Sequence, residues 1–247
     1  MIKYIFLGIV QGLTEFLPVS SSGHLVILQK ILGINTDQLA VSVILHLGTL
    51  IALIIFFWQD ILNLLRDLRL LSLVSLVVLI TGIIGVLGKE FFESLFNSVK
   101  AVGIAWLFTG LILISTKRLN RLNRDKLKLK DAVILGLSQS LAIVPGISRS
   151  GITISTLFYR RVERGVAFTF SFLVSIPVIL GAAFLEARKL DDIPGGQVLN
   201  LTAGFIFSLL TGLLSLLFLR MVINKAKFHY FGYYCFFMSL ITLIFIK

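Results

Sequence analysis

The sequence has little cysteine and few charged residues. A single cysteine, Cys235, occurs in 247 residues, which excludes an intrachain disulfide and a cysteine-based metal site. Charged residues make up 14% of the chain and hydrophobic residues 57%, and the mean hydropathy is +1.00. Soluble domains of this size do not have such a composition. The sequence therefore predicts an integral membrane protein in which Cys235 packs inside an apolar segment.

Acidic residues are scarcer than basic ones. The chain has 12 Asp and Glu against 23 Lys and Arg, which gives a formal net charge of +11. In a soluble protein this excess would suggest nucleic-acid binding, but here the basic residues gather between apolar runs, as membrane topology requires. We therefore expect no nucleic-acid partner.

Apolar runs of roughly 20 residues, long enough to cross a bilayer, recur along the chain. They predict an all-α membrane protein with six transmembrane helices. The predicted crossings are Leu39–Trp58, Leu70–Gly88, Val99–Ser115, Val166–Ala187, Leu199–Leu219 and Phe228–Ile246.

One motif of 16 residues occurs twice, 128 positions apart. The segment GIVQGLTEFLPVSSSG at Gly8–Gly23 aligns without a gap with GLSQSLAIVPGISRSG at Gly136–Gly151, and six positions are identical. Each copy has a proline shortly before its serines and so breaks a helix inside an apolar stretch. Such breaks occur at membrane depth only where they face a cavity or other protein. Both copies are interpreted as re-entrant helix-break-helix hairpins, over Ile2–Leu32 and Lys130–Phe158.

Each half then contains one hairpin and three crossings. Because three is odd, the second half starts from the opposite side of the membrane, which predicts an inverted repeat whose broken tips meet near the midplane. The prediction is a single membrane domain, residues 1–247, with repeat 1 at about 1–116, a basic linker at 117–130 and repeat 2 at about 130–247.

The basic residues also predict the orientation. Seven Lys and Arg lie on one side of this topology and 15 on the other, leaving out Arg149 in the second break. The side with 15 belongs in the cytoplasm, so both termini and the mouth of the first hairpin face outward. The linker Lys117–Lys130 anchors this topology and contacts anionic headgroups, with a dedicated partner site as the alternative. Reading Met1–Ser22 as a signal peptide is disfavoured by the second copy of the motif.

Two ionisable residues lie in the breaks. A charged side chain in mid-membrane costs about 2.5 to 3.5 kcal/mol, so Glu15 and Arg149 should face a partner or a wet cavity. Gln11 lies one turn before Glu15 on the same helix face. The structural alternative is an ion pair between Glu15 and Arg149 that clamps the two halves together.

Serines and glycines follow the proline in both copies, at the start of a second short helix. Hydroxyls and free amides at two helix starts form a cradle for an anion, and phosphate is its usual occupant. Arg149 adds a charge suited to phosphate oxygens. The alternative is that the serines act only as helix caps. The residues of this predicted cradle are Ser20, Ser21, Ser22, Gly23, Ser148, Ser150 and Gly151.

Three histidines complete the candidates. His24 follows the first serine cluster and can donate or accept a proton near neutral pH. His46 lies within a predicted crossing, where packing or a helix contact is the simpler interpretation, and His229 at a membrane boundary is interpreted as structural. A hydroxyl, an imidazole, a carboxylate and an arginine together favour phosphoryl transfer over passive binding.

At these residues the chain resembles a known family, the undecaprenyl-diphosphatases, also called bacitracin-resistance proteins. The resemblance covers essentially the whole chain. It implies a multi-pass hydrolase of the bacterial plasma membrane, with its site toward the outer face, that removes one phosphate from undecaprenyl diphosphate and so recycles the lipid carrier of cell-wall synthesis. The motifs that carry it are QGLTEFLPVSSSGH at Gln11–His24, PGISRSG at Pro145–Gly151, LHLGTLIAL at Leu45–Leu53 and FSFLVSIP at Phe170–Pro177.

The resemblance also implies residue roles. The family's first acidic position is Gln11 here, so Glu15 alone would carry carboxylate chemistry. Its serine motif falls on Ser20–Ser22 with His24, and its arginine motif on Ser148–Ser150. We expect catalytic roles for Glu15, Ser21, His24 and Arg149, and substrate binding by Gln11, Ser20, Ser22, Gly23, Ser148, Ser150 and Gly151.

Several alternatives stay open from the sequence. The nucleophile is Ser21 or an activated water. No cofactor is required, although Mg²⁺ or Ca²⁺ could bridge a diphosphate and Glu15. A homodimer is compatible with the sequence. Inverted repeats with broken helices also suit a transporter or flippase of a phosphorylated lipid. A purely structural scaffold would leave the cost of Glu15 and Arg149 unexplained.

Overall fold

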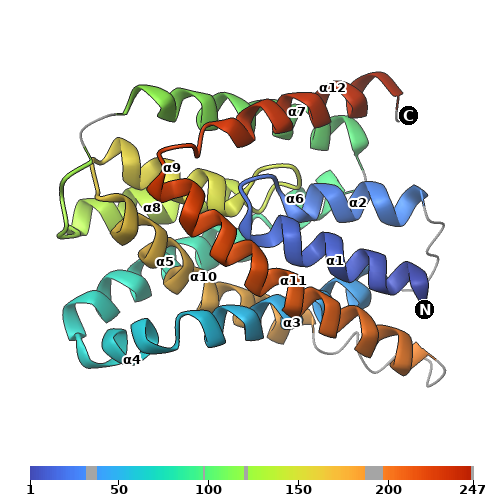
Figure 1. The fold of residues 1–247 in the computed structure, drawn as a ribbon, viewed down its shortest axis with the longest axis horizontal. Coiled ribbons are helices and arrows are strands. Elements are labelled where there is room, and N and C mark those ends of the chain that lie inside the picture. Colours follow the sequence, from blue (N-terminus) through green and yellow to red (C-terminus); the bar gives the residue numbers. More distant parts are fainter. Residues whose placement is uncertain (32–37, 97, 120–121, 187–196, 246–247) are drawn as a thin grey trace.

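The computed structural model describes residues 1–31, 38–96, 98–119, 122–186 and 197–245. In these ranges the chain forms helices joined by turns, with one isolated β-bridge between Arg124 and Val162 (Figure 1). The helices are α1 (Ile2–Phe16), α2 (Ser21–Ile31), α3 (Gln38–Phe56), α4 (Trp58–Arg66), α5 (Leu68–Leu87), α6 (Lys89–Phe96), α7 (Val99–Ser115), the 3₁₀ turn η1 (Thr116–Arg118), α8 (Leu129–Leu141), α9 (Arg149–Tyr159), α10 (Arg164–Glu186), α11 (Val198–Asn224) and α12 (Tyr230–Phe245).

Each of the six predicted crossings has a helix in the structure. Four of them, α5, α7, α10 and α11, are long and apolar enough to span a membrane, and α3 with α4 forms a fifth, bent span. The last, α12, is apolar but has only 16 residues. The all-α, multi-pass membrane class is therefore confirmed. The predicted ends at Leu32, Ala187 and Ile246 lie outside the described residues.

The first predicted crossing, Leu39–Trp58, extends past the end of the helix that the structure shows. Instead of running to Trp58, α3 ends at Phe56 and is bent by 72° against α4. The bend occurs at Phe57, which is 2% exposed, and its ring lies 5.4 Å and 5.7 Å from the rings of Phe168 and Phe172 of α10. Burying an aromatic ring is strongly favourable, and a continuous apolar run does not indicate where such a ring turns the chain.

The short helices α4 and α6 were not predicted. Their sequences are too polar to count as crossings and too short to show a clear helical period. The start of α5 has a visible cause, because the carboxylate of Asp67 accepts hydrogen bonds from the amides of Arg69 and Leu70. This is an N-cap, and it begins the helix two residues before the predicted Leu70.

Small residues bring α1 close to α11. A Cβ atom on Gly8 would lie 2.2 Å from the carbonyl oxygen of Gly204, and one on Gly12 would lie 2.0 Å from Thr211 Oγ1. Glycines four residues apart allow this backbone contact between membrane helices. The contact fixes α1, and with it the side chains of Gln11 and Glu15, inside the protein.

The linker region carries a buried ion cluster. The side chain of Asp131, near the start of α8, is fully buried and accepts hydrogen bonds from Arg124 Nη1 at 2.6 Å and Arg160 Nε at 2.8 Å. A third hydrogen bond comes from the amide of Lys128, the N-cap residue of α8. Burial by itself would raise the pKa of Asp131, but the hydrogen bonds from both arginines outweigh it and lower that pKa.

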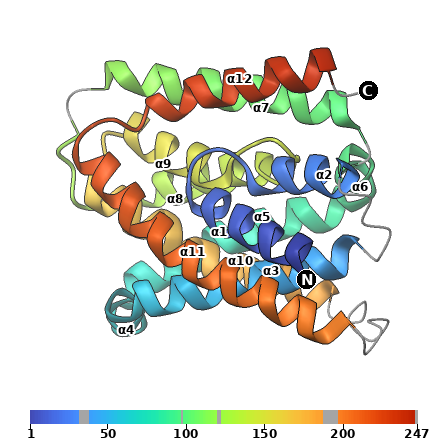
Figure 2. The same cartoon turned by 45° about the vertical axis from the view of Figure 1, so that its right-hand side comes forward.

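The two helix pairs α1–α2 and α8–α9 enter from opposite ends of the bundle, and the turns that join each pair approach one another in the middle (Figures 1 and 2). Helix α1 packs on α11, and α8 packs on α5. Helices α7 and α12 lie side by side along one flank and cover the two turns. The repeat boundaries at 1–116 and 130–247 stay a prediction.

Candidate active site

The first break begins where α1 ends. Phe16 is its last residue, and Leu17 already has an extended backbone with φ −63° and ψ 145°. Glu15, directly before Phe16, and Gln11, one turn earlier, are buried on the same face, and Gln11 Nε2 donates to Glu15 Oε2 at 3.1 Å. The predicted common face of Gln11 and Glu15 is thus observed.

Ser20 connects the two breaks. Its backbone has φ +67°, and its side chain is directed into the protein, where it is 4% exposed. The hydroxyl oxygen accepts hydrogen bonds from the amide of Gly23 at 3.4 Å and from the amide of Gly146 in the second break at 3.1 Å. Ser20 therefore caps its own helix and also holds the other repeat copy.

The second break repeats the local arrangement of the first. Ser148 caps α9 by accepting from the amide of Gly151 at 3.1 Å, as Ser20 does with Gly23 in α2. Its hydroxyl lies 3.3 Å from that of Ser150, and Ser20 and Ser22 are paired at 3.2 Å. The capping alternative for the serines is therefore realised at Ser20 and Ser148.

Helix α7 binds both breaks. Trp106 Nε1 donates to the carbonyl of Val19 in the first break at 2.7 Å. One turn later, Thr109 Oγ1 donates to the carbonyl of Gly146 at 3.0 Å and accepts from the amide of Ser148 at 3.2 Å. These contacts satisfy backbone groups that the broken helices leave open, and they fix both turns to one helix.

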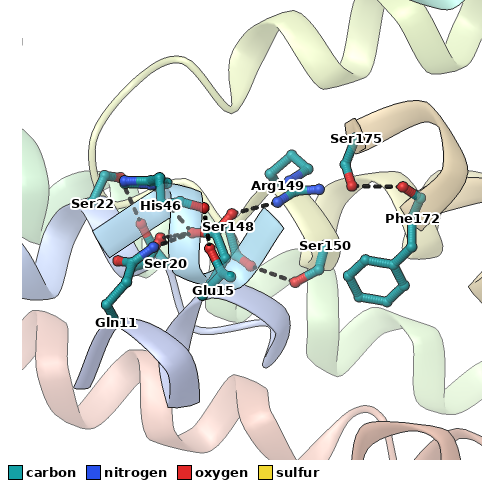
Figure 3. A network of polar contacts seen from close by, with 12 residues as sticks. Gln11, Glu15, Ser20, Ser22, His46, Ser148, Arg149, Ser150, Phe172 and Ser175 are labelled. Carbon is teal, nitrogen blue, oxygen red and sulfur yellow. Dashed lines mark hydrogen bonds and ion pairs between the residues drawn. The ribbon is translucent and has the colours of Figure 1, made fainter. Parts of the chain in front are cut away.

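Four side chains surround the carboxylate of Glu15. Arg149 Nη2 lies 2.5 Å from Oε1, while Oε2 accepts from Ser21 Oγ at 2.5 Å and from Gln11, and lies 3.4 Å from His46 Nε2 (Figure 3). The charged and polar groups come from α1, α2, α3 and α9. The ion pair between Glu15 and Arg149 that the sequence offered as a structural alternative is formed, and it joins the two hairpins.

Two buried polar atoms of this cluster have no hydrogen-bond partner among the described residues. They are Arg149 Nη1 and Gln11 Oε1. Buried polar atoms are nearly always paired in native proteins, so each such atom calls for an explanation. One donor of Arg149 and one acceptor of Gln11 remain available for a further polar group.

His24 does not contact this cluster. Its Nδ1 lies 2.7 Å from the carbonyl oxygen of Ser20, its Nε2 lies 2.7 Å from Tyr234 Oη, and its ring meets the edge of Trp106. The imidazole thus links α2 to α12. The catalytic role predicted for His24 stays a prediction.

His46 is a neighbour of Glu15 that the predicted site residues did not include. It was expected to make a packing or helix contact, and its Nε2 on α3 does face Glu15 on α1. The cost argument that singled out Glu15 and Arg149 would also have flagged an imidazole in the middle of an apolar helix.

The structure therefore brings together Gln11, Glu15, Ser21 and Arg149. The remaining predicted binding residues lie beside them, at the ends of the two breaks and in the first turns of α2 and α9, where Ser20 and Ser148 cap the amides of Gly23 and Gly151. Among the described residues, no group of three or more His, Cys, Asp or Glu side chains could hold a metal ion. An apolar cavity of about 380 Å³ between α4, α5 and α10 shares no residue with the cluster.

The sequence also matches known proteins along nearly its whole length. Residues 4–241 match the family model described as Bacitracin resistance protein BacA. The chain is 42% identical to an undecaprenyl-diphosphatase of Halothermothrix orenii, covering 98% of this chain and 96% of the relative. It is 41% identical to one of Carboxydothermus hydrogenoformans (97% and 95% covered) and 40% identical to one of Alkaliphilus metalliredigens (98% and 98%).

Proposed function

The chain belongs to the bacitracin resistance protein BacA family, and from that premise we propose that it hydrolyses undecaprenyl diphosphate to undecaprenyl phosphate and inorganic phosphate. One observation carries the proposal beyond family membership. The hydroxyl of Ser21 and the guanidinium of Arg149, from different hairpins, bind opposite oxygens of the same carboxylate, that of Glu15. The groups that we propose as nucleophile and phosphate-binding cation thus both contact the carboxylate that we propose as the base.

In the proposed reaction the Ser21 hydroxyl, or a water in its place, attacks the terminal phosphorus. Glu15 Oε2 lies 2.5 Å from Ser21 Oγ and takes its proton. The bond from that phosphorus to the bridging oxygen breaks, and undecaprenyl phosphate leaves. Glu15 passes its proton to the departing undecaprenyl phosphate and is a base again. In the serine route, water then attacks the phosphoserine and gives a proton to Glu15, phosphate is released, and the Ser21 oxygen takes that proton from Glu15.

Arg149 and Gln11 hold the diphosphate in this proposal. The free Nη1 of Arg149 is buried and donates to a phosphate oxygen, where a charge-assisted bond is strong. The unpaired Gln11 Oε1 accepts from a protonated phosphate oxygen or a bound water. The helix starts at Ser21 and Arg149 add amide donors and positive dipole ends, with Ser22 and Ser150 beside them.

Ser20 and Ser148, which were predicted to bind substrate, have an indirect role in this proposal. Their hydroxyls hold the amides of Gly23 and Gly151, so they shape the two helix starts that receive the phosphate. Glu15 is the residue that would hold a divalent cation such as Mg²⁺ or Ca²⁺, because hard cations prefer carboxylate oxygens. Such an ion would neutralise charge on the diphosphate.

The site is proposed to open toward the outer face of a bacterial plasma membrane, with both termini outside. The distribution of Lys and Arg supports this orientation, because 15 of them lie on the side that holds residues 117–130 and seven on the other, and the richer side belongs in the cytoplasm. A cysteine introduced at Lys3 should react with a membrane-impermeant maleimide in intact cells, and one at Lys126 only after the cells are opened. The reverse pattern would overturn the orientation.

The test of the reaction is phosphate release by protein purified in detergent, with undecaprenyl, farnesyl and water-soluble diphosphates as substrates. We expect wild-type protein and an Arg66→Ala control, which removes an exposed arginine of α4, to release phosphate from the prenyl diphosphates. Arg149→Ala and Glu15→Gln should lose hydrolysis while remaining folded. Lipid movement between leaflets without phosphate release would favour the carrier instead.

A further inference from the structure

His46 faces the reactive carboxylate from a third element. It lies in the middle of α3 and is the second residue of the motif Leu45–Leu53. This segment is separate from both copies of the repeated 16-residue motif. Its Nδ1 lies 2.7 Å from the carbonyl oxygen of Ser42 one turn earlier, so Nδ1 carries a proton and donates it there. The other nitrogen, Nε2, is thereby directed at Glu15 Oε2 at 3.4 Å, and it donates to that oxygen in the imidazolium form, because a carboxylate only accepts.

The geometry of Arg149 shows what this contact does. An arginine beside a carboxylate favours a two-pronged pair with both oxygens. Here only Nη2 binds Glu15, through Oε1, and Nη1 has no partner among the described residues. The second oxygen, Oε2, is held on the opposite side by Gln11, Ser21 and His46.

We propose that His46 is a positioning residue of this active site, which holds Glu15 Oε2 on Ser21 and away from Arg149. The inference rests on the proposed hydrolysis and deepens it. Without the imidazole, the carboxylate turns toward the guanidinium and closes a two-pronged pair with Arg149. That single rotation removes the base from Ser21 and also occupies the donor that binds phosphate.

The consequence is a combined kinetic signature. In His46→Leu, which is apolar and close in size, kcat falls because Ser21 loses its base. At the same time KM rises because Arg149 Nη1 is engaged. A hydrogen bond to a charged group corresponds to about a ten- to hundredfold change, so we expect kcat/KM to fall by that factor. A defect in folding alone would lower the active fraction, and thus kcat, with KM unchanged.

The experiment compares four proteins in detergent with undecaprenyl diphosphate: wild type, His46→Leu, His46→Gln and the control His229→Leu, which removes an imidazole from the turn before α12. The amide of His46→Gln can still donate to Glu15, so it should recover most of kcat and KM. His229→Leu should match wild type. Thermal unfolding of each variant establishes that the comparison is made on folded protein.

The outcomes separate the inference from its premise. No hydrolysis by wild-type protein would overturn the proposed function itself. Hydrolysis by wild type with unchanged kcat and KM in His46→Leu would overturn only the role of His46. A fall in kcat without a rise in KM, or an equal loss in His46→Gln, would also overturn it, because neither follows from a freed carboxylate.

Discussion

The hydroxyl of Thr109 is the sharpest place to test how the site is held together. It lies on α7, is 3% exposed, and bonds the carbonyl of Gly146 and the amide of Ser148. Valine has nearly the same shape but no hydroxyl. In Thr109→Val both backbone groups lose this partner next to Arg149, whose position depends on the turn that they belong to.

The magnitude follows from the two groups. Each buried polar group that loses its partner costs about 1 to 3 kcal/mol. Because the two groups share one hydroxyl, their costs do not add fully. We expect the free energy of unfolding to fall by about 2 to 4 kcal/mol. For a chain of this size, this corresponds to a fall of about 4 to 16 °C in the unfolding midpoint. Displacing Arg149 by about 1 Å should lower hydrolysis by about a hundredfold.

The assay is thermal unfolding in detergent together with phosphate release at a temperature where the variant is folded. Thr116→Val is the matched control, since Thr116 is also buried, follows α7 directly, and its hydroxyl donates to the carbonyl of Leu113 within its own turn. If Thr109→Val unfolds like this control and hydrolyses at the wild-type rate, α7 does not position the second break.

Three further predictions follow from single contacts. Ser21→Ala should abolish a phosphoenzyme that rapid quenching traps in wild type, whereas full turnover by this variant would exclude the covalent route. Tyr234→Phe should lower the unfolding midpoint by a few degrees through loss of the bond to His24, with hydrolysis retained; a tenfold loss of kcat in folded protein would instead tie His24 to the reaction. Asp131→Asn should destabilise the protein at neutral pH, because the lowered pKa of Asp131 gives stability that is present above the ordinary carboxyl pKa and lost as pH falls through the lowered value. The difference in unfolding midpoint between wild type and variant should therefore shrink as the pH is lowered, and a constant difference would contradict this.

The repeated motif made much of the site predictable. Because the two copies break their helices at the same offset, an ion pair between Glu15 and Arg149 could be expected from the sequence, whereas the bond from Ser21 to Glu15 was not predicted. The crossings could be expected from the apolar runs. The end of Val99–Ser115 agrees with α7 to the residue. Composition and spacing carry this information, since membrane depth restricts both.

Contacts between helices that share no repeated motif or spacing in the sequence could not be predicted. His46 reaches Glu15 from α3, 31 positions away, in a segment that reads only as apolar. His24 lies next to the serines in sequence, yet four residues form one helical turn, and its ring is directed back to Ser20 and across to α12. The bend at Phe57 depends on rings of α10, which are far away in sequence.

The attachment of both turns to α7 has a consequence for how such proteins can vary. Since Trp106 and Thr109 set the separation of the two turns, the length of the surface connections does not. Insertions or deletions between residues 117 and 130 that keep Arg124 and Lys128 in contact with Asp131 should leave the reacting groups in register. Substitutions on one face of a single helix, by contrast, act on both halves of the protein at once.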